Sequence, residues 1–131
     1  MNEAVEFLKG CGTFYVATCE GDQPRVRPFG ALDVFEDKLY IVTNNRKKVY
    51  AQLLADPKLE LCAMNSDGRW IRVAAQSVVD HRPEAREHML ESNPGLRRMY
   101  AADDGLMEVA YLKDVVATIE SFGGTPQVIR F

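Results

Sequence analysis

The segment RVRPFG, residues 25 to 30, places two arginines two positions apart in a stretch that reads as extended chain. Side chains alternate along such a chain, so Arg25 and Arg27 point to one face and Val26 and Pro28 to the other. Two guanidinium groups on one face repel each other unless an anion lies between them. The pair therefore predicts an anion-binding site.

A second cationic group lies in TNNRKKVYAQL, residues 43 to 53. Here Thr43 and Asn44 end an expected strand, and a helix is expected to begin with the cationic run at residues 46 to 48. Cations at a helix N-terminus oppose the macrodipole, at a cost of about 0.3 to 1 kcal/mol each. A phosphate would reverse that effect, because backbone N–H groups, polar side chains and ammonium groups would all bind it. A solvated helix face is the alternative reading, and these residues alone do not choose between the two.

Composition limits the possible functions. The 131 residues are 47% hydrophobic and 27% charged, with a net charge of -3, which predicts one domain over residues 1–131 and no nucleic-acid partner. No apolar run approaches the roughly 18 residues of a membrane span, and the N-terminus lacks signal-peptide features. We therefore expect a cytoplasmic protein that does not enter a membrane.

Cysteine and histidine give weaker signals. The three cysteines, Cys11, Cys19 and Cys62, form an odd set without CxxC spacing, which predicts reduced, buried thiols and no metal site. His81 and His88 are seven residues apart, whereas two ligands on one helical face are four apart, so both are expected at the surface.

The order of predicted elements indicates the fold class. We expect helices at residues 2–10, 46–56 and 83–93, with a short further one at 94–101, and Gly10 as the cap of the first. Strands are expected at residues 13–19, 25–35, 39–44, 58–65, 69–80, 107–121 and 126–131, with 25–35 and 39–44 forming a hairpin. Several of these strands are joined by short turns, which require antiparallel pairing. The chain is therefore predicted to be α+β, an antiparallel split β-barrel with helices in the connections.

These motifs resemble the pyridoxamine 5′-phosphate oxidase-like, FMN-binding split barrels. In that family a strand arginine and a segment Thr-Asn-x-x-Ser-Arg-Lys-x-x-Gln hold the FMN phosphate. Counted without gaps, Arg27 matches the strand arginine, Lys48 the second arginine and Gln52 the glutamine. The resemblance covers roughly the first 75 residues. It implies a set of cofactor-binding residues: Arg25, Val26, Arg27, Pro28, Val42, Thr43, Asn44, Lys47, Lys48, Gln52 and Trp70.

Departures from the family pattern narrow the activity. Lys47 stands where the family has serine, Val49 where it has lysine, and Leu32 where the oxidases have another lysine. The C-terminus carries only Arg130 and no histidine, which argues against vitamin B6 oxidation. RVRPFG together with GRWIRV is closer to small bacterial relatives, including the group associated with nitroimidazole resistance.

The resemblance implies a mechanism and an assembly. It implies an oxidoreductase that uses FMN to pass electrons from a nicotinamide donor to a small aromatic or nitro-bearing acceptor. It also implies a homodimer with the flavin at the interface, where Trp70 of the partner subunit would cover it; a core tryptophan is the alternative. A binding module for flavin, haem or another tetrapyrrole, without turnover, remains a second class of function.

The paired arginines give one further expectation. If their repulsion is relieved only by a bound anion, Arg27→Gln lowers FMN affinity and leaves the stability of the ligand-free protein unchanged or raised. Arg25→Gln should act in the same direction, more weakly.

Overall fold

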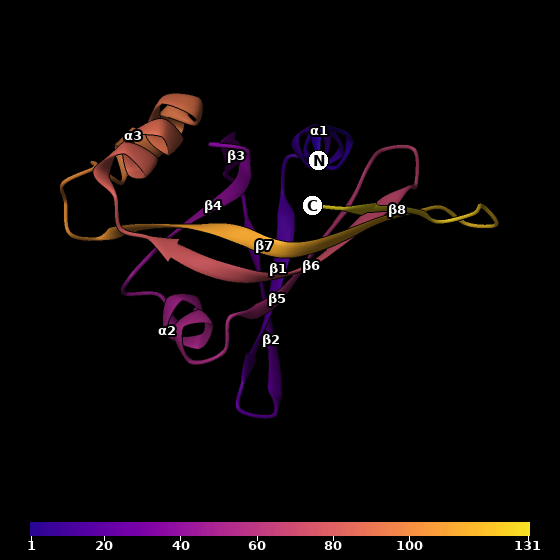
Figure 1. Ribbon diagram of the computed structural model, residues 1–131, viewed down its shortest axis with the longest axis horizontal. Helices are drawn as coiled ribbons and strands as arrows, with labels where there is room; N and C mark the ends of the chain where they lie inside the picture. Colours follow the sequence, from indigo (N-terminus) through magenta and orange to yellow (C-terminus); the bar gives the residue numbers. More distant parts are fainter.

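A computed structural model describes residues 1–131 and consists of one curled, eight-stranded antiparallel sheet with helices in its connections (Figure 1). The sheet order is β2-β1-β5-β6-β7-β4-β3, and β8 pairs with β7. The elements are α1 (Asn2–Cys11), β1 (Phe14–Glu20), β2 (Gln23–Phe29), β3 (Leu32–Phe35), β4 (Lys38–Asn44), α2 (Lys48–Ala55), β5 (Lys58–Met64), β6 (Trp70–Asp80), α3 (Pro83–Ser92), the 3-10 helix η1 (Pro94–Arg98), β7 (Met107–Glu120) and β8 (Gln127–Arg130). The two edge strands, β2 and β3, do not pair with each other, so the sheet is curled but not closed. This confirms the predicted α+β fold with an antiparallel split barrel.

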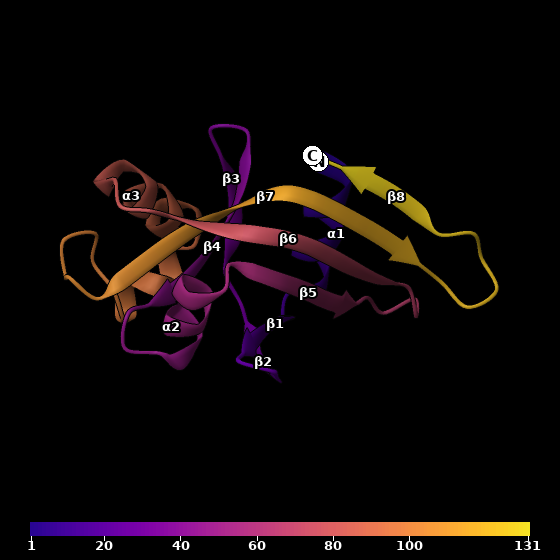
Figure 2. The same ribbon diagram turned by 60° about the horizontal axis from the view of Figure 1, so that its bottom comes forward.

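The segment 25–35 is two strands rather than the single predicted one. The extended chain is interrupted at Gly30 and Ala31. β2, before the interruption, pairs with β1, and β3, after it, pairs with β4. The predicted hairpin between residues 25–35 and 39–44 is therefore wrong for its first half. Consequently β2 and β3 occupy opposite edges of the sheet (Figure 2).

The strands bury one face each against a shared core. β5 alternates buried and exposed residues along its whole length, as expected for a sheet with one covered face. The main cluster holds 22 buried residues, drawn from α1, α2 and the inner face of the sheet. A second cluster of nine lies where α3 and η1 cover β4 and β7. These two clusters fix the helices that border the site described below.

Two helix ends differ from the sequence expectation. α1 continues past Gly10 and ends at Gly12, whose φ of 77° suits a residue without a side chain. α2 begins at Lys48 and not at Arg46, because the Asn44 side chain accepts a hydrogen bond from the Arg46 backbone N–H (3.1 Å) and holds a turn there. Lys47 is the extended residue before the helix.

A buried polar group joins β4, β6 and the start of α3. The Tyr40 hydroxyl, fully buried, donates to Asp80 Oδ2 (2.7 Å), and the Arg82 guanidinium donates to the same carboxylate (2.9 Å) and to Glu36 (2.8 Å). The hydrogen bonds from Arg82 hold the pKa of Asp80 well below its usual range, against the effect of burial. Burial and the Asp80 carboxylate raise the pKa of Tyr40 to about 12.

We expect Asp80→Asn to lower the free energy of unfolding by about 1 to 3 kcal/mol at neutral pH, because Tyr40 and Arg82 lose a charged acceptor. A lowered folded-state pKa stabilises above the unfolded value of about 3.9 and is lost as pH falls through the folded value. The difference between the two proteins should therefore shrink below about pH 4. Urea unfolding at pH 7 and pH 3.5 measures it, and equal stabilities at pH 7 would show that the group contributes nothing.

The cysteines and histidines are only partly as predicted. Cys19 and Cys62 are exposed and Cys11 is half-buried, so the prediction of buried thiols is wrong. Cys19 and Cys62 lie on the outward-facing side of β1 and β5, at positions that alternate with the buried residues of these strands. His81 is exposed, whereas His88 is half-buried and its Nε2 lies 2.9 Å from Asp33 Oδ2. No helix has the length and apolar character that crossing a membrane requires.

Candidate functional site: an anion pocket beside an apolar pocket

The two arginines of RVRPFG face the interior side of the sheet. Arg27 is paired with Val16 and Arg25 with Thr18, so both point toward the buried face of β1, and Val26 points outward with two thirds of its surface exposed. The predicted alternation is confirmed. α2 packs against both β1 and β4, which brings it next to the arginines even though β2 and β4 are not paired.

Arg27 is held by three hydrogen bonds. Its Nη1 donates to the backbone oxygen of Val16 (3.1 Å) and to the Thr18 hydroxyl (2.8 Å), and its Nη2 donates to Gln52 Oε1 (2.6 Å). Thr18 and Gln52 are both buried. Burial and the neighbouring charge of Arg25 lower the pKa of Arg27, and the carboxylate of Glu20 acts in the opposite direction.

Glu20 completes this network at the end of β1. Its Oε1 accepts from Arg25 Nη2 (3.0 Å), and its Oε2 accepts from Gln52 Nε2 (3.1 Å). The arginines are therefore not left without an anion, and the expectation that only a bound ligand relieves their repulsion is wrong. Since Arg27 also anchors two buried polar side chains, its loss should lower ligand-free stability rather than leave it unchanged.

Around this network lies a pocket of about 400 Å³, which we call the anion pocket. It is lined by Glu20, Arg25, Val26, Arg27, Lys47, Lys48, Val49 and Gln52. Four cationic side chains thus surround one carboxylate. Such a pocket can bind a phosphate through charge-assisted hydrogen bonds. Six residues that the sequence analysis proposed, from two distant segments, meet here.

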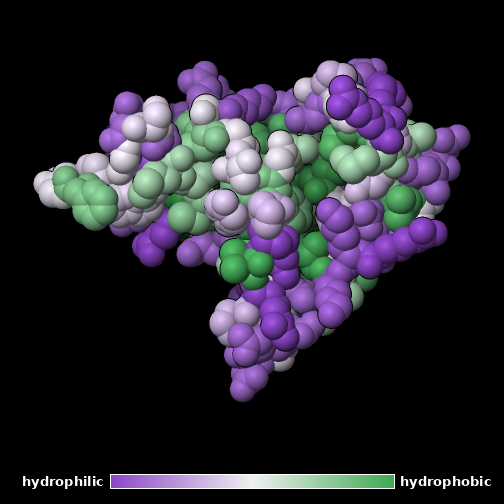
Figure 3. Space-filling model, turned by 180° about the vertical axis from the view of Figure 1, so that it is seen from behind, coloured by the Kyte–Doolittle hydropathy of each residue, from purple (hydrophilic) through white to green (hydrophobic).

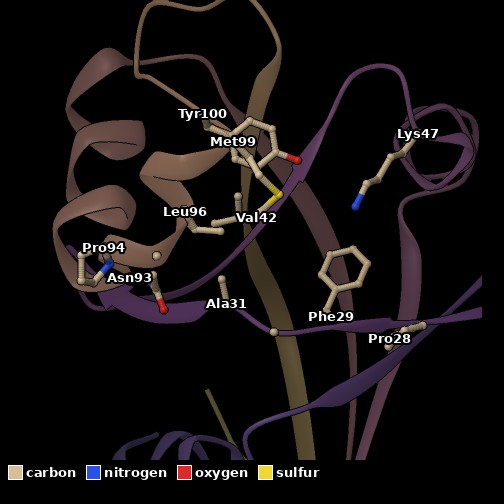
Figure 4. Close-up of a pocket in the computed structure, with 12 residues that line it drawn as sticks. Pro28, Phe29, Ala31, Val42, Lys47, Asn93, Pro94, Leu96, Met99 and Tyr100 are labelled. Atoms are coloured by element: carbon tan, nitrogen blue, oxygen red, sulfur yellow. The ribbon is translucent and has the colours of Figure 1, made fainter.

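A second cavity of about 450 Å³, the apolar pocket, adjoins the first through Lys47, which lines both. Its walls include Pro28, Phe29 and Val42 on one side and Leu96, Met99 and Tyr100 around η1 on the other. Figure 4 shows Lys47 reaching in with its nitrogen above the ring of Phe29, and Tyr100 directing its hydroxyl toward the same space. The volume is in the usual range for small-molecule sites, about 300 to 1,000 Å³.

Thr43 and Asn44 border the site without lining either pocket. Asn44 Nδ2 donates to the Tyr100 hydroxyl (2.8 Å), so this residue positions a wall of the apolar pocket. The Thr43 hydroxyl oxygen is buried and has no hydrogen-bond partner within the chain. An unpaired buried hydroxyl costs about 1 to 3 kcal/mol.

Trp70 is not brought to this site within one chain. It begins β6 opposite Met64, at the far end of the β5–β6 hairpin from α2 (Figure 2). Glu60 of β5 pairs with the residue of β1 that also pairs with Val26. The end of β5 at Met64 lies four residues beyond Glu60, which is about 13 Å at roughly 3.3 Å per residue. The indole Nε1 donates to Glu120 Oε2 (3.0 Å), and the ring packs on Phe122.

Sequence reasoning missed several residues of the site. Phe29, Leu96, Met99 and Tyr100 were assigned no role, because their part depends on how η1 folds back over β4. Glu20 was likewise assigned no role. Its spacing of five residues from Arg25 across a tight hairpin was the available signal, since it places the two charges on neighbouring strands.

Leu32 and Arg130 lie outside both pockets. Leu32 is buried in the main core cluster and does not face either pocket, so a lysine at that position would not suit this chain. Arg130 lies on β8, exposed and away from both pockets.

The fold is that of a split barrel, with a cationic pocket and an apolar pocket side by side. A family model described as pyridoxamine 5′-phosphate oxidase matches residues 1–123, and the chain belongs to that family, whose fold binds flavin. The resemblance found in the sequence is confirmed. No curated protein matches the sequence.

Solved structures agree with this assignment. A NimC/NimA family protein from Clostridium acetobutylicum is 49% identical with a TM-score of 0.97, covering 100% of this chain and 92% of its own. General Stress Protein 26 from Bacillus anthracis shares the fold at 14% identity and TM-score 0.80, with coverages of 99% and 97%. A pyridoxamine 5′-phosphate oxidase-related, FMN binding protein from Nostoc punctiforme does so at 12% and 0.65, with coverages of 98% and 92%.

Proposed function

We propose that this chain is an FMN-dependent oxidoreductase that passes electrons from a nicotinamide donor to a small aromatic or nitro-bearing acceptor. The observation that carries the proposal is the direct junction, through Lys47, of a four-cation pocket and an apolar pocket. FMN has a dianionic phosphate at one end and an aromatic ring system at the other. The residues present therefore fit it at both ends.

Each side chain has a role in holding the cofactor. Arg25, Arg27, Lys47 and Lys48 would bind the phosphate, and Gln52 keeps Arg27 in place through its 2.6 Å hydrogen bond. The backbone around Val26, and Pro28 and Val42, would complete the contacts, while Thr43 and Asn44 border the site and Asn44 holds Tyr100 against the pocket. These assignments extend the family motif onto Lys47 and Lys48 jointly.

The bound flavin would supply the two-electron chemistry. The protein's part is then to bind, to orient and to limit access of water, which Phe29, Leu96 and Met99 do by lining the apolar pocket. Lys47 is the only charged side chain in that lining, so an uncharged aromatic acceptor suits it better than a phosphorylated one.

We also propose a homodimer, as the family resemblance implies. The outward face of β2, β1 and β5 carries Val26, Tyr15 and Met64, which are 67%, 50% and 58% exposed. Figure 3 shows hydrophobic residues gathered over the middle of one face of the molecule, above a hydrophilic tip. Exposed apolar patches of this kind are typical of interaction surfaces. In such a dimer Trp70 would reach the flavin of the partner subunit.

Sedimentation of the FMN-loaded protein tests the assembly. A dimer is expected at micromolar concentration, because an isologous contact would cover the outward face of both copies. A stable monomer with bound flavin would contradict it. We also place the protein in the cytoplasm, where a nicotinamide electron donor would be available to it.

Anaerobic reduction of the reconstituted protein tests the activity. Flavin absorbance should fall on addition of a reduced nicotinamide and return on addition of a nitroaromatic acceptor. The matched control is Arg27→Gln, which should need a higher FMN concentration to show the same absorbance changes. Failure of the wild type to bind FMN would overturn the proposal.

A second candidate is a binding module without turnover, for flavin, haem or another tetrapyrrole. Met99 and Tyr100 line the apolar pocket and are residue types that can ligate haem iron. The absorbance spectrum of the protein as purified separates a flavin from a haem. Bound flavin that no nicotinamide reduces would favour the module.

A further inference from the structure

Glu20 is the one acidic side chain in the lining of the anion pocket. Two hydrogen bonds from Arg25, at 3.0 and 3.3 Å, and one from Gln52, at 3.1 Å, hold its carboxylate beside the cations. The hydrogen bonds from Arg25 and Gln52, together with the charges of Arg25 and Lys48, keep the pKa of Glu20 below its usual value. The carboxylate is therefore charged at neutral pH.

We propose that Glu20 is an internal counter-anion that occupies the cationic site in the ligand-free protein and competes with the phosphate of the ligand. The carboxylate accepts from Arg25, a donor that a phosphate would also use, and from the amide nitrogen of Gln52, whose oxygen accepts from Arg27. It thereby holds the empty site assembled and limits its affinity for dianions. The identity of the ligand as FMN rests on the proposed function; the competition rests on Glu20 and its neighbours.

The charges around Glu20 set the direction of the effect. Without Glu20 the pocket would hold four cations and no anion, which disfavours the folded protein when no ligand is bound. A phosphate dianion bound near Glu20 meets a like charge, which weakens its binding by an amount that falls with ionic strength. Glu20 therefore lowers the affinity for the ligand and raises the stability of the ligand-free protein.

Glu20→Gln and Glu20→Ala test this together. The glutamine keeps an oxygen that accepts from Arg25, and the alanine removes it, so the pair separates charge from geometry. We expect both variants to bind FMN about 5- to 20-fold more tightly than the wild type at low salt, with riboflavin affinity unchanged. The gain should diminish as salt is raised. Ligand-free melting temperatures of both should be lower.

Glu6→Gln is the matched control. Glu6 lies exposed on α1 and makes no hydrogen bond or ion pair, yet its replacement changes the net charge by the same amount. It should alter neither affinity nor melting temperature. Equal gains in Glu6→Gln and Glu20→Gln would reduce the effect to net charge and overturn the proposal. So would weaker FMN binding by Glu20→Ala, which would make Glu20 a positioning residue.

Inorganic phosphate as a second probe distinguishes the two proposals. Its stabilising effect on the melting temperature should be larger in Glu20→Gln than in the wild type. If FMN does not bind the wild type but this difference is found, the proposed function is wrong and the role of Glu20 stands. If neither FMN nor phosphate discriminates between the two proteins, the inference about Glu20 is wrong.

Discussion

Arg27→Gln is expected to lower FMN affinity about 10- to 150-fold, the range that corresponds to 1.5 to 3 kcal/mol for a hydrogen bond to a charged group. The arginine both faces the anion pocket and anchors Thr18 and Gln52, so the effect combines lost charge with lost positioning. The same change should lower the free energy of unfolding of the ligand-free protein by about 1 to 3 kcal/mol.

Fluorescence quenching by FMN and a thermal melt of the ligand-free variant measure the two effects. Arg130→Gln on β8 is the control for loss of an exposed arginine and should change neither quantity by more than about 0.5 kcal/mol. Arg27→Lys keeps the charge without the forked donor and should fall between wild type and glutamine. Unchanged affinity in Arg27→Gln would remove this residue from the site.

Lys48→Ala should weaken FMN binding by about 1.5 to 3 kcal/mol and riboflavin binding far less, because only FMN has the phosphate. Lys48 is the first residue of α2 and lines the anion pocket, where its side chain makes no hydrogen bond to another residue of the chain. The ligand-free protein should consequently keep its stability, in contrast to Arg27→Gln.

Parallel titrations of FMN and riboflavin separate phosphate recognition from ring recognition. Lys113→Ala, an exposed lysine of β7, is the matched control and should leave both affinities unchanged. Equal losses of FMN and riboflavin affinity in Lys48→Ala would place Lys48 beside the ring or in a purely structural role.

The sequence predicted most of the residues that line the anion pocket, but not the arrangement of strands that brings them together. Alternation placed Arg25 and Arg27 on one face, and the motif around Lys48 and Gln52 named two further residues that line the same pocket. The route by which the halves meet was predicted wrongly. It depends on the curl of the sheet and on α2 bridging β1 and β4, which are long-range contacts that no local pattern records.

Local competition explains the remaining differences. The chain breaks after Phe29 because β2 and β3 join different partners, although every residue from Arg25 to Phe35 is compatible with extended chain. α2 starts late because Asn44 holds Arg46 in a turn. The position of Tyr100 depends on the folding of η1 over β4, and the role we propose for Trp70 depends on the proposed dimer.

A crystal structure of the protein with FMN tests the central claim most directly. We expect the phosphate within hydrogen-bond distance of Arg27 and Lys48, the ring system against the apolar pocket, and Arg25 turned away from Glu20 toward the phosphate. A phosphate bound outside the anion pocket, with Arg27 still paired only to Val16, Thr18 and Gln52, would contradict this account.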